Sequence, residues 1–225
     1  MKSQALLILL AASSALAQGT FQNLDFESAN IPINPGLYIP FNNALPGWTG
    51  SLGPYSATEA AYNEIAGGFA TVSIIDGSSR SYSNSVIDGN YTAAISAGFA
   101  GTSFVATAVS QTAQTPVTAR SLIFTAQSFS SISALKVTFA GQDIPFFLLG
   151  SGENFQTYGA DISPFAGMTG ELRFSENPTF THVTTTVLLD NIQFSDVAIP
   201  EPSVLTLSGL STLLLTWRFL RQPRP

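Results

Sequence analysis

The chain has 225 residues, and between Asp25 and Glu201 it contains 14 acidic residues but only four basic ones, a net charge of −10 over that stretch. Such an acidic surface disfavours binding to nucleic acids and other anionic polymers. The chain has no cysteine, which excludes a disulfide framework and thiol chemistry.

The first 17 residues have the pattern of a secretory signal peptide. Lys2 precedes a short apolar run, and Ala15-Leu16-Ala17 offers a small-residue cleavage site before Gln18. The run is too short to span a membrane. We therefore predict a signal peptide at residues 1–17 and an exported domain at residues 18–197, long enough for one substantial core.

The exported domain shows the two-residue alternation of β-strands. Apolar residues alternate with polar ones at 135–139 and 171–175, and similar patterns occur at 104–110 and 121–125. Turn-forming pairs such as Asp76-Gly77 separate these runs, and Ser163 to Ala166 reads as one helical turn. The pattern predicts an all-β domain, an antiparallel two-sheet sandwich of about ten to twelve strands.

Five short motifs resemble those of galactose-binding-like jelly rolls, a group that includes carbohydrate-binding modules. They stand in consistent order at residues 23–27, 45–48, 88–95, 165–174 and 188–194. The resemblance implies that the sandwich is a jelly roll.

The same resemblance implies a structural calcium site. In carbohydrate-binding members of the group the first and last strands hold the ion, and Glu27 and Asp190 are the matching positions, with Asp25 as a further ligand. Alternation places Asp190 on the core side with Leu188, Ile192 and Phe194, where a carboxylate needs partners. The alternative is that Asp190 accepts backbone N–H bonds at a bend in the strand, with no metal.

Three aromatic residues are candidates for binding a sugar. Trp48 follows Pro46-Gly47, whereas Tyr55 and Tyr62 lie in a turn-rich stretch near acidic residues. The alternative is that all three pack in the core.

Catalysis has little support from the residues. His182 is the single histidine, so a centre with several histidine ligands is excluded, and no nucleophile-elbow or dinucleotide-binding motif is present. No pair among the 14 acidic residues is singled out for glycoside hydrolysis. We therefore predict that the chain is not an enzyme.

The C-terminal segment, residues 198–225, resembles the PEP-CTERM sorting signal. Pro200-Glu201-Pro202 precedes an apolar run, which is followed by Arg218, Arg221 and Arg224. These arginines indicate a cytoplasmic end, and the prolines mark the start of a membrane helix predicted at 203–220. The resemblance implies processing by an exosortase-type enzyme. The alternative is an amphipathic helix that packs on the domain.

The sequence thus predicts an exported, membrane-anchored protein of the cell surface or extracellular matrix. One predicted function is non-catalytic binding of extracellular polysaccharide. The alternative is a structural or adhesive surface protein with no small ligand.

Overall fold

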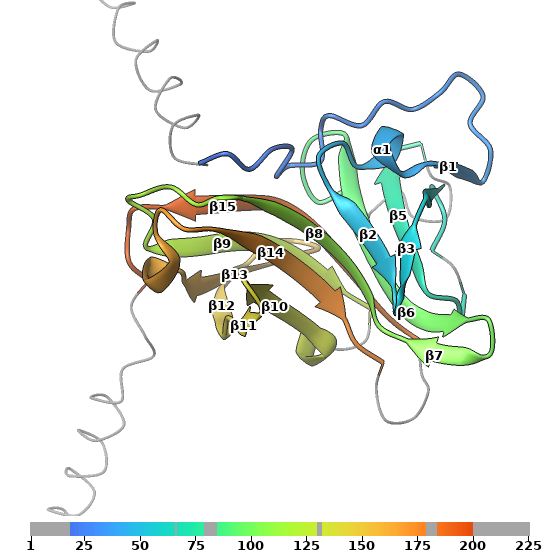
Figure 1. Ribbon diagram of the computed structural model, residues 1–225. Coiled ribbons are helices and arrows are strands. Elements are labelled where there is room, and N and C mark those ends of the chain that lie inside the picture. The colour runs from blue at the N-terminus through green and yellow to red at the C-terminus, as the bar shows by residue number, and fades with distance from the viewer. Residues whose placement is uncertain (1–18, 66, 79–84, 130–131, 179–183, 200–225) are drawn as a thin grey trace, which may run out of the picture.

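A computed structural model describes residues 19–65, 67–78, 85–129, 132–178 and 184–199 (Figure 1). The signal peptide predicted at 1–17 and the membrane helix predicted at 203–220 lie outside these residues. Within the described ranges, no helix has the length and apolar character needed to cross a bilayer.

The described residues form two β-sheets, here called sheet A and sheet B. The strands of sheet A are, in spatial order, β1 (Tyr38–Pro40), β4 (Glu59–Tyr62), β5 (Thr71–Asp76), β6 (Tyr91–Ala100), β15 (Thr185–Ser195), β9 (Ser121–Ser128), β13 (Gln156–Asp161) and β12 (Phe146–Ser151), with β7 (Ser103–Val105) paired to β6. The strands of sheet B are β11 (Gln142–Asp143), β10 (Leu135–Phe139), β14 (Thr169–Glu176), β8 (Thr107–Gln114), β2 (Thr49–Leu52) and β3 (Tyr55–Ala57). The helices are α1 (Phe41–Ala44), η1 (Ile132–Ala134) and η2 (Ser163–Phe165).

This architecture confirms the prediction of an all-β, two-sheet sandwich. The helical turn predicted at Ser163 is also present as η2. One detail of the prediction is wrong: β4 and β5 pair in parallel, whereas the other strand pairs are antiparallel. β5 therefore runs in the same direction as β4.

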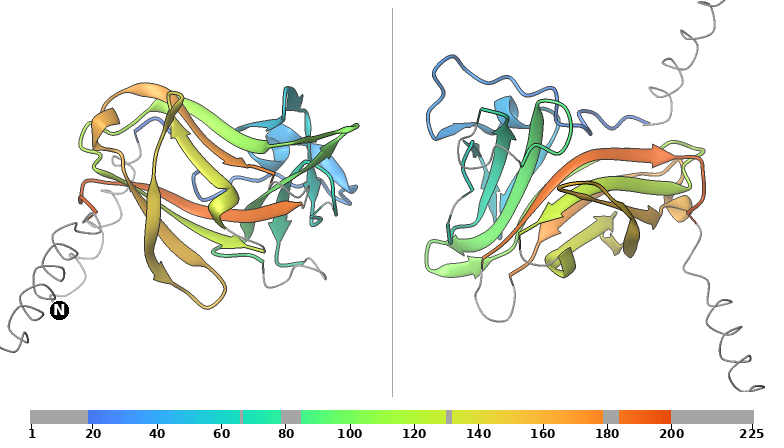
Figure 2. Two further views of the ribbon diagram at one scale, coloured as in Figure 1. Left: turned by 90° about the horizontal axis from the view of Figure 1, so that it is seen from below. Right: turned by 180° about the vertical axis from the view of Figure 1, so that it is seen from behind.

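The main core lies between the two sheets, which form two curved layers (Figure 2). It combines inward side chains of sheet A, such as Phe124 and Leu189, with Phe139 and Phe174 of sheet B. Aromatic rings meet in its centre: the Phe124 and Phe174 rings lie edge to face with centroids 5.3 Å apart. Burial of these apolar side chains is the main force that holds the sheets together.

A second, smaller apolar cluster lies on the outer side of sheet A. Ile75, Ala94 and Leu188 are fully buried there, and Val86 and Ile87 pack over them. The chain near residues 85–92 therefore covers part of this outer face. Sheet A is buried on both sides at this point, which explains the nearly continuous apolar run Val187-Leu188-Leu189 in β15.

A β-bulge in β15 changes which residues face the main core. The pairing with β9 shifts between Asp190 and Gln193, and Asn191 has a left-handed backbone with φ of 50°. Leu189 lies in the main core before the bulge, and Ile192 and Phe194 lie there after it.

The predicted facing of Leu188 is therefore wrong, because strict alternation does not run through a bulge. Leu188 and Asp190 lie on the outer side of sheet A, not on the side of Ile192 and Phe194.

Candidate functional site

The outer side of sheet B carries an ordered set of polar side chains, here called the polar face. In β14, Leu172 and Phe174 lie in the core, so Glu171, Arg173 and Ser175 project to the other side. The same alternation in the neighbouring strands adds Thr49, Ser51, Ser110, Lys136 and Thr138 to the polar face.

The strand register arranges these side chains in rows. Thr138 is paired with Arg173, Arg173 with Ser110, and Ser110 with Thr49, which forms one row across four strands. Neighbouring strands are about 4.8 Å apart, so hydroxyl and charged groups recur at that interval across the sheet. A ligand lying across the strands would meet donors and acceptors in turn.

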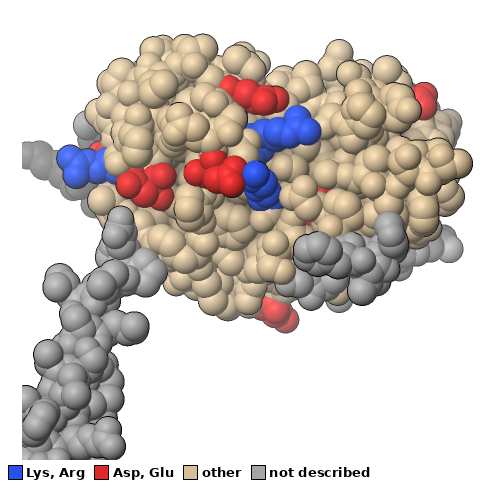
Figure 3. All heavy atoms as spheres, turned by 60° about the horizontal axis from the view of Figure 1, so that its bottom comes forward, with Lys and Arg blue, Asp and Glu red and all other residues tan. Residues whose placement is uncertain are grey.

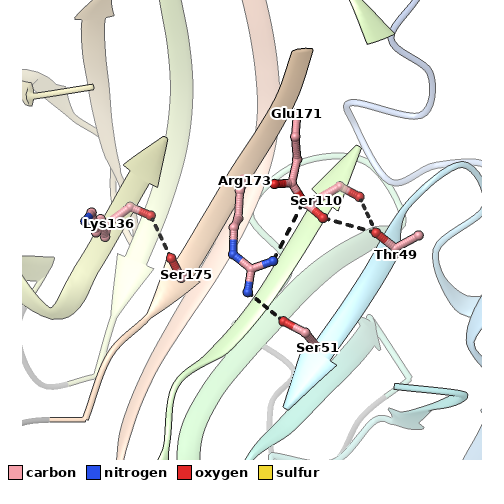
Figure 4. A network of polar contacts seen from close by, with 7 residues as sticks. All are labelled: Thr49, Ser51, Ser110, Lys136, Glu171, Arg173 and Ser175. Carbon is pink, nitrogen blue, oxygen red and sulfur yellow. Dashed lines mark hydrogen bonds and ion pairs between the residues drawn. The ribbon is translucent and has the colours of Figure 1, made fainter. Parts of the chain in front are cut away.

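Hydrogen bonds already link several groups of the polar face (Figure 4). One Nη of Arg173 donates to Ser51 Oγ at 2.7 Å, and the other lies 3.8 Å from Glu171 Oε1. The Thr49 hydroxyl donates to the Ser110 carbonyl oxygen at 3.1 Å. These contacts hold the Arg173 guanidinium in place. Its five N–H donors outnumber the contacts described.

The polar face carries charges of both signs. Lys136 Nζ lies 2.8 Å from Asp143 Oδ1, and both side chains are about half exposed or more. In the space-filling view, basic and acidic side chains gather beside a hollow in the middle of one side of the molecule (Figure 3). Exposed ion pairs contribute little to stability, so these groups can exchange their partners for a polar ligand at small cost.

Trp48 does not form part of any exposed platform. It is 2% exposed and packs against Phe26, with ring centroids 5.5 Å apart. Its indole N–H donates to the Asn23 carbonyl oxygen at 2.9 Å. The prediction that Trp48 binds a sugar is therefore wrong. The alternative, that Trp48 packs in the core, describes its position.

The two candidate tyrosines have different surroundings. Tyr55 is 63% exposed at the start of edge strand β3. Tyr62 is half-buried, and its hydroxyl donates to Asp76 Oδ2 at 2.5 Å. Ser56 next to Tyr55 pairs with Ser51, so alternation sends Tyr55 away from the polar face. The structure does not bring the two tyrosines together, and sugar binding by either stays a prediction.

Glu27 binds the turn that precedes β6. Its Oε1 accepts the N–H groups of Asn90 and Tyr91 at 2.8 and 2.9 Å, and its Oε2 accepts the Asn90 side-chain amide at 2.8 Å. Gly89 has φ of 63° and no room for a Cβ beside the Glu27 carboxylate, so glycine is required there. Asp25 instead accepts the N–H of Glu27 at 3.3 Å and is exposed.

Asp190 holds the same turn from the side of β15. Its Oδ2 accepts the Thr92 hydroxyl at 2.6 Å and the Asp88 N–H at 3.3 Å, and its Oδ1 accepts the Asn191 N–H at 2.7 Å. This confirms the alternative expectation of backbone N–H bonds at a bend. Burial raises the pKa of Asp190 to about 7, although these hydrogen bonds oppose the increase.

Both carboxylates therefore receive hydrogen bonds at both oxygens. Donor hydrogens that point at these oxygens would repel a cation, so the present arrangement does not fit a calcium ion held by Glu27 and Asp190 together. Among the described residues, no group of three or more acidic or histidine side chains could hold a metal ion. Calcium binding stays a prediction, which melting temperatures recorded with chelator and then with calcium would test.

Sequence reasoning did not select the residues of the polar face as a site. Their signal was present in the alternation at 135–139 and 171–175, which correctly predicted the outward side of β10 and β14. The alternation could not predict that β8 and β2 continue the rows, because pairing of distant strands is not encoded locally. The sorting residues Pro200, Glu201, Pro202, Arg218, Arg221 and Arg224 lie outside the described residues.

Comparisons with known proteins give a structural likeness but show no family. No protein-family model and no curated protein matches the sequence. A crystal structure of the apo form of a cyclase from Fischerella sp. matches the fold with a TM-score of 0.42 and 13% identity, over 77% of this chain and 93% of the cyclase chain.

This likeness corrects the prediction that the chain is not an enzyme. The matched chain is described as a cyclase, so the statement that this chain is not an enzyme is withdrawn. A TM-score of 0.42 at 13% identity assigns no reaction to this chain.

Proposed function

We propose that the chain is an exported surface or matrix-associated protein whose β-sandwich binds an extracellular polysaccharide through the polar face. The finer fold that we propose is a jelly roll of the galactose-binding-like type. The observation that carries this proposal is the cross-strand row Thr138–Arg173–Ser110–Thr49, which places hydroxyl groups on both sides of a charged group over four strands of sheet B.

Sugar hydroxyls both donate and accept hydrogen bonds, and the polar face offers both kinds of partner. Arg173 and Lys136 supply donors, Glu171 supplies acceptors, and the serine and threonine hydroxyls supply either. The regular spacing of the rows suits an extended chain of repeating units better than a single small molecule.

A glycan array with the full chain tests the proposal. We expect discrete binding to polysaccharides, and we expect Arg173→Leu to weaken it at least tenfold, because it removes the central donors. Arg120→Leu is the matched control: it makes the same change of charge on a residue outside the polar face. Equal loss in both variants, or no binding at all, would favour the structural or adhesive alternative.

We propose further that residues 198–225 act as a PEP-CTERM signal, which anchors the precursor in the membrane and presents it to an exosortase-type enzyme. The placement of Pro200-Glu201-Pro202 directly before the apolar run supports this. In the native host, Glu201→Ala should accumulate as an unprocessed membrane precursor, detected by size and cell fractionation. Normal processing of the variant would contradict the proposed signal.

A further inference from the structure

Glu176 is a buried acidic residue for which the proposed function has no use. The side chain is fully buried at the end of β14, and neither carboxyl oxygen has a hydrogen-bond partner among the described residues. It has the same alternation phase as Leu172 and Phe174, so it lies between the two sheets. A charged carboxylate in such a place carries a large desolvation cost.

Several strands begin or end at the level of Glu176. Thr107 and Leu135, its cross-strand partners, are the first residues of β8 and β10. Thr185, the first residue of β15, brings a strand end of the opposite sheet to the same level, but its hydroxyl proton is donated to the Asn177 carbonyl oxygen and not to Glu176. Glu176 therefore closes one end of the sandwich.

A small clasp lies directly beside this carboxyl. The Thr185 hydroxyl donates to the Asn177 carbonyl oxygen at 3.0 Å, which joins sheet A to the end of β14. The Asn177 N–H donates to the Ala134 carbonyl oxygen at 2.9 Å, which joins β14 to the start of β10. One residue, Asn177, thus ties together three strand ends next to Glu176.

The surroundings of Glu176 contain no compensating charge within the described part of the chain. Its cross-strand neighbours are Thr107, a hydroxyl residue, and Leu135, an apolar residue of the main core. The Thr107 hydroxyl is itself buried without a partner. Lys136 and Arg173 lie on the polar face, on the other side of sheet B.

We propose that this end of the sandwich is a pH-dependent clasp, closed while Glu176 is neutral and opened when Glu176 ionises. The ionised carboxylate requires water, and separation of the Asn177–Thr185 link between the sheets would admit it. Burial raises the pKa of Glu176 to about 8, so the clasp is closed in neutral solution and opens under mildly alkaline conditions. The apolar side chains of the main core stay packed.

Hydrogen–deuterium exchange of the full chain at pH 6.5 and pH 9.5 tests the clasp, with rates corrected for the intrinsic effect of pH. We expect peptides covering 103–110, 172–178 and 184–188 to lose protection at least tenfold at the higher pH. In Glu176→Gln, which cannot ionise, the loss should be less than twofold. Asp190→Asn, which removes the other buried carboxyl, should behave like the wild type.

The proposal is overturned if wild-type protection is unchanged between the two pH values. It is also overturned if Glu176→Gln loses as much protection as the wild type. Should Glu176→Gln fail to fold, Glu176→Met has nearly the same volume and gives the same comparison. The outcome does not depend on sugar binding, so it is separate from the glycan array.

Discussion

The outer sides of the two sheets differ, although both are built from alternating strands. On sheet A, the chain near residues 85–92 covers the surface and buries Leu188 and Asp190. On sheet B, the corresponding side carries the polar face, where the charged side chains of Lys136, Glu171 and Arg173 are partly exposed although Ser110 and Ser175 are buried. The comparison teaches that an outward position in a sandwich is not always an exposed one, so the same kind of substitution should have very different effects on the two sides.

The largest expected effect concerns Asp190 and pH. An unfolded aspartate has a pKa near 3.9, whereas in the folded state the pKa of Asp190 is about 7. Between these values the folded state keeps a proton that the unfolded state has lost, so the free energy of unfolding falls as the pH rises. The contribution of protonated Asp190 to the free energy of unfolding is fully present below about pH 4. The free energy of unfolding should decrease by roughly 3–4 kcal/mol by pH 7 as this contribution is lost.

Urea denaturation of the wild type and Asp190→Asn across this pH range measures the effect. The variant should lack the part of the pH dependence due to Asp190 and keep the part due to Glu176. Identical pH profiles for the two proteins would show that Asp190 is not buried as described.

Next in size is the loss of apolar packing on the covered side. Leu188→Ala should lower the free energy of unfolding by about 2–3 kcal/mol, because it removes fully buried methyl groups under Val86 and Ile87. Chemical denaturation checks this. A cost below 0.5 kcal/mol, the range for an exposed position, would mean that the outer cluster does not form.

A smaller cost is expected for the donor that holds Asp190. Thr92→Val keeps the shape of the side chain but removes the hydroxyl that donates to Asp190 Oδ2. We expect a loss of about 1–2 kcal/mol at neutral pH, measured by thermal or urea unfolding. Thr92→Ser, which retains a hydroxyl, serves as the control and should lose less.

The smallest effect is expected on the polar face. Arg173→Leu removes the contacts to Ser51 and Glu171 from the polar face, yet it should change the free energy of unfolding by at most about 0.5 kcal/mol. Its effect should be confined to ligand binding. A destabilisation above 2 kcal/mol would make Arg173 a structural residue and remove it from the proposed site.

Much of this fold follows from alternation in the sequence. The patterns at 135–139 and 171–175 predict both the core side and the polar side of β10 and β14, and Glu176 continues the inward phase of Phe174. The burial of the outer side of sheet A does not follow from alternation, because the segment that covers this side is remote in sequence from β15. The facing of Leu188 was missed for a second reason: a bulge leaves no mark in a simple two-residue pattern.

The candidate site was less predictable than the fold. The sequence around Trp48 is compatible with either a core position or an exposed loop position. Only the packing of Trp48 against Phe26 in the structure shows that it lies in the core. The rows of the polar face depend on the pairing of β2, β8 and β14, which are far apart in the chain. The sequence singled out Glu27 and Asp190 as a pair because both were expected to bind calcium. In the structure they are related for a different reason: both accept hydrogen bonds from the turn that precedes β6.

The single extra residue at Asn191 divides β15 into two halves with opposite phase. The bulge thus lets Leu189 before it and Ile192 and Phe194 after it face the same main core, although plain alternation would place them on opposite sides. Deleting Asn191 would remove the extra residue, so Ile192 would follow Asp190 in plain alternation, and Ile192 and Phe194 would still face the main core. A related sequence with a gap at this position should therefore keep the same order of apolar and polar residues on both sides of the gap.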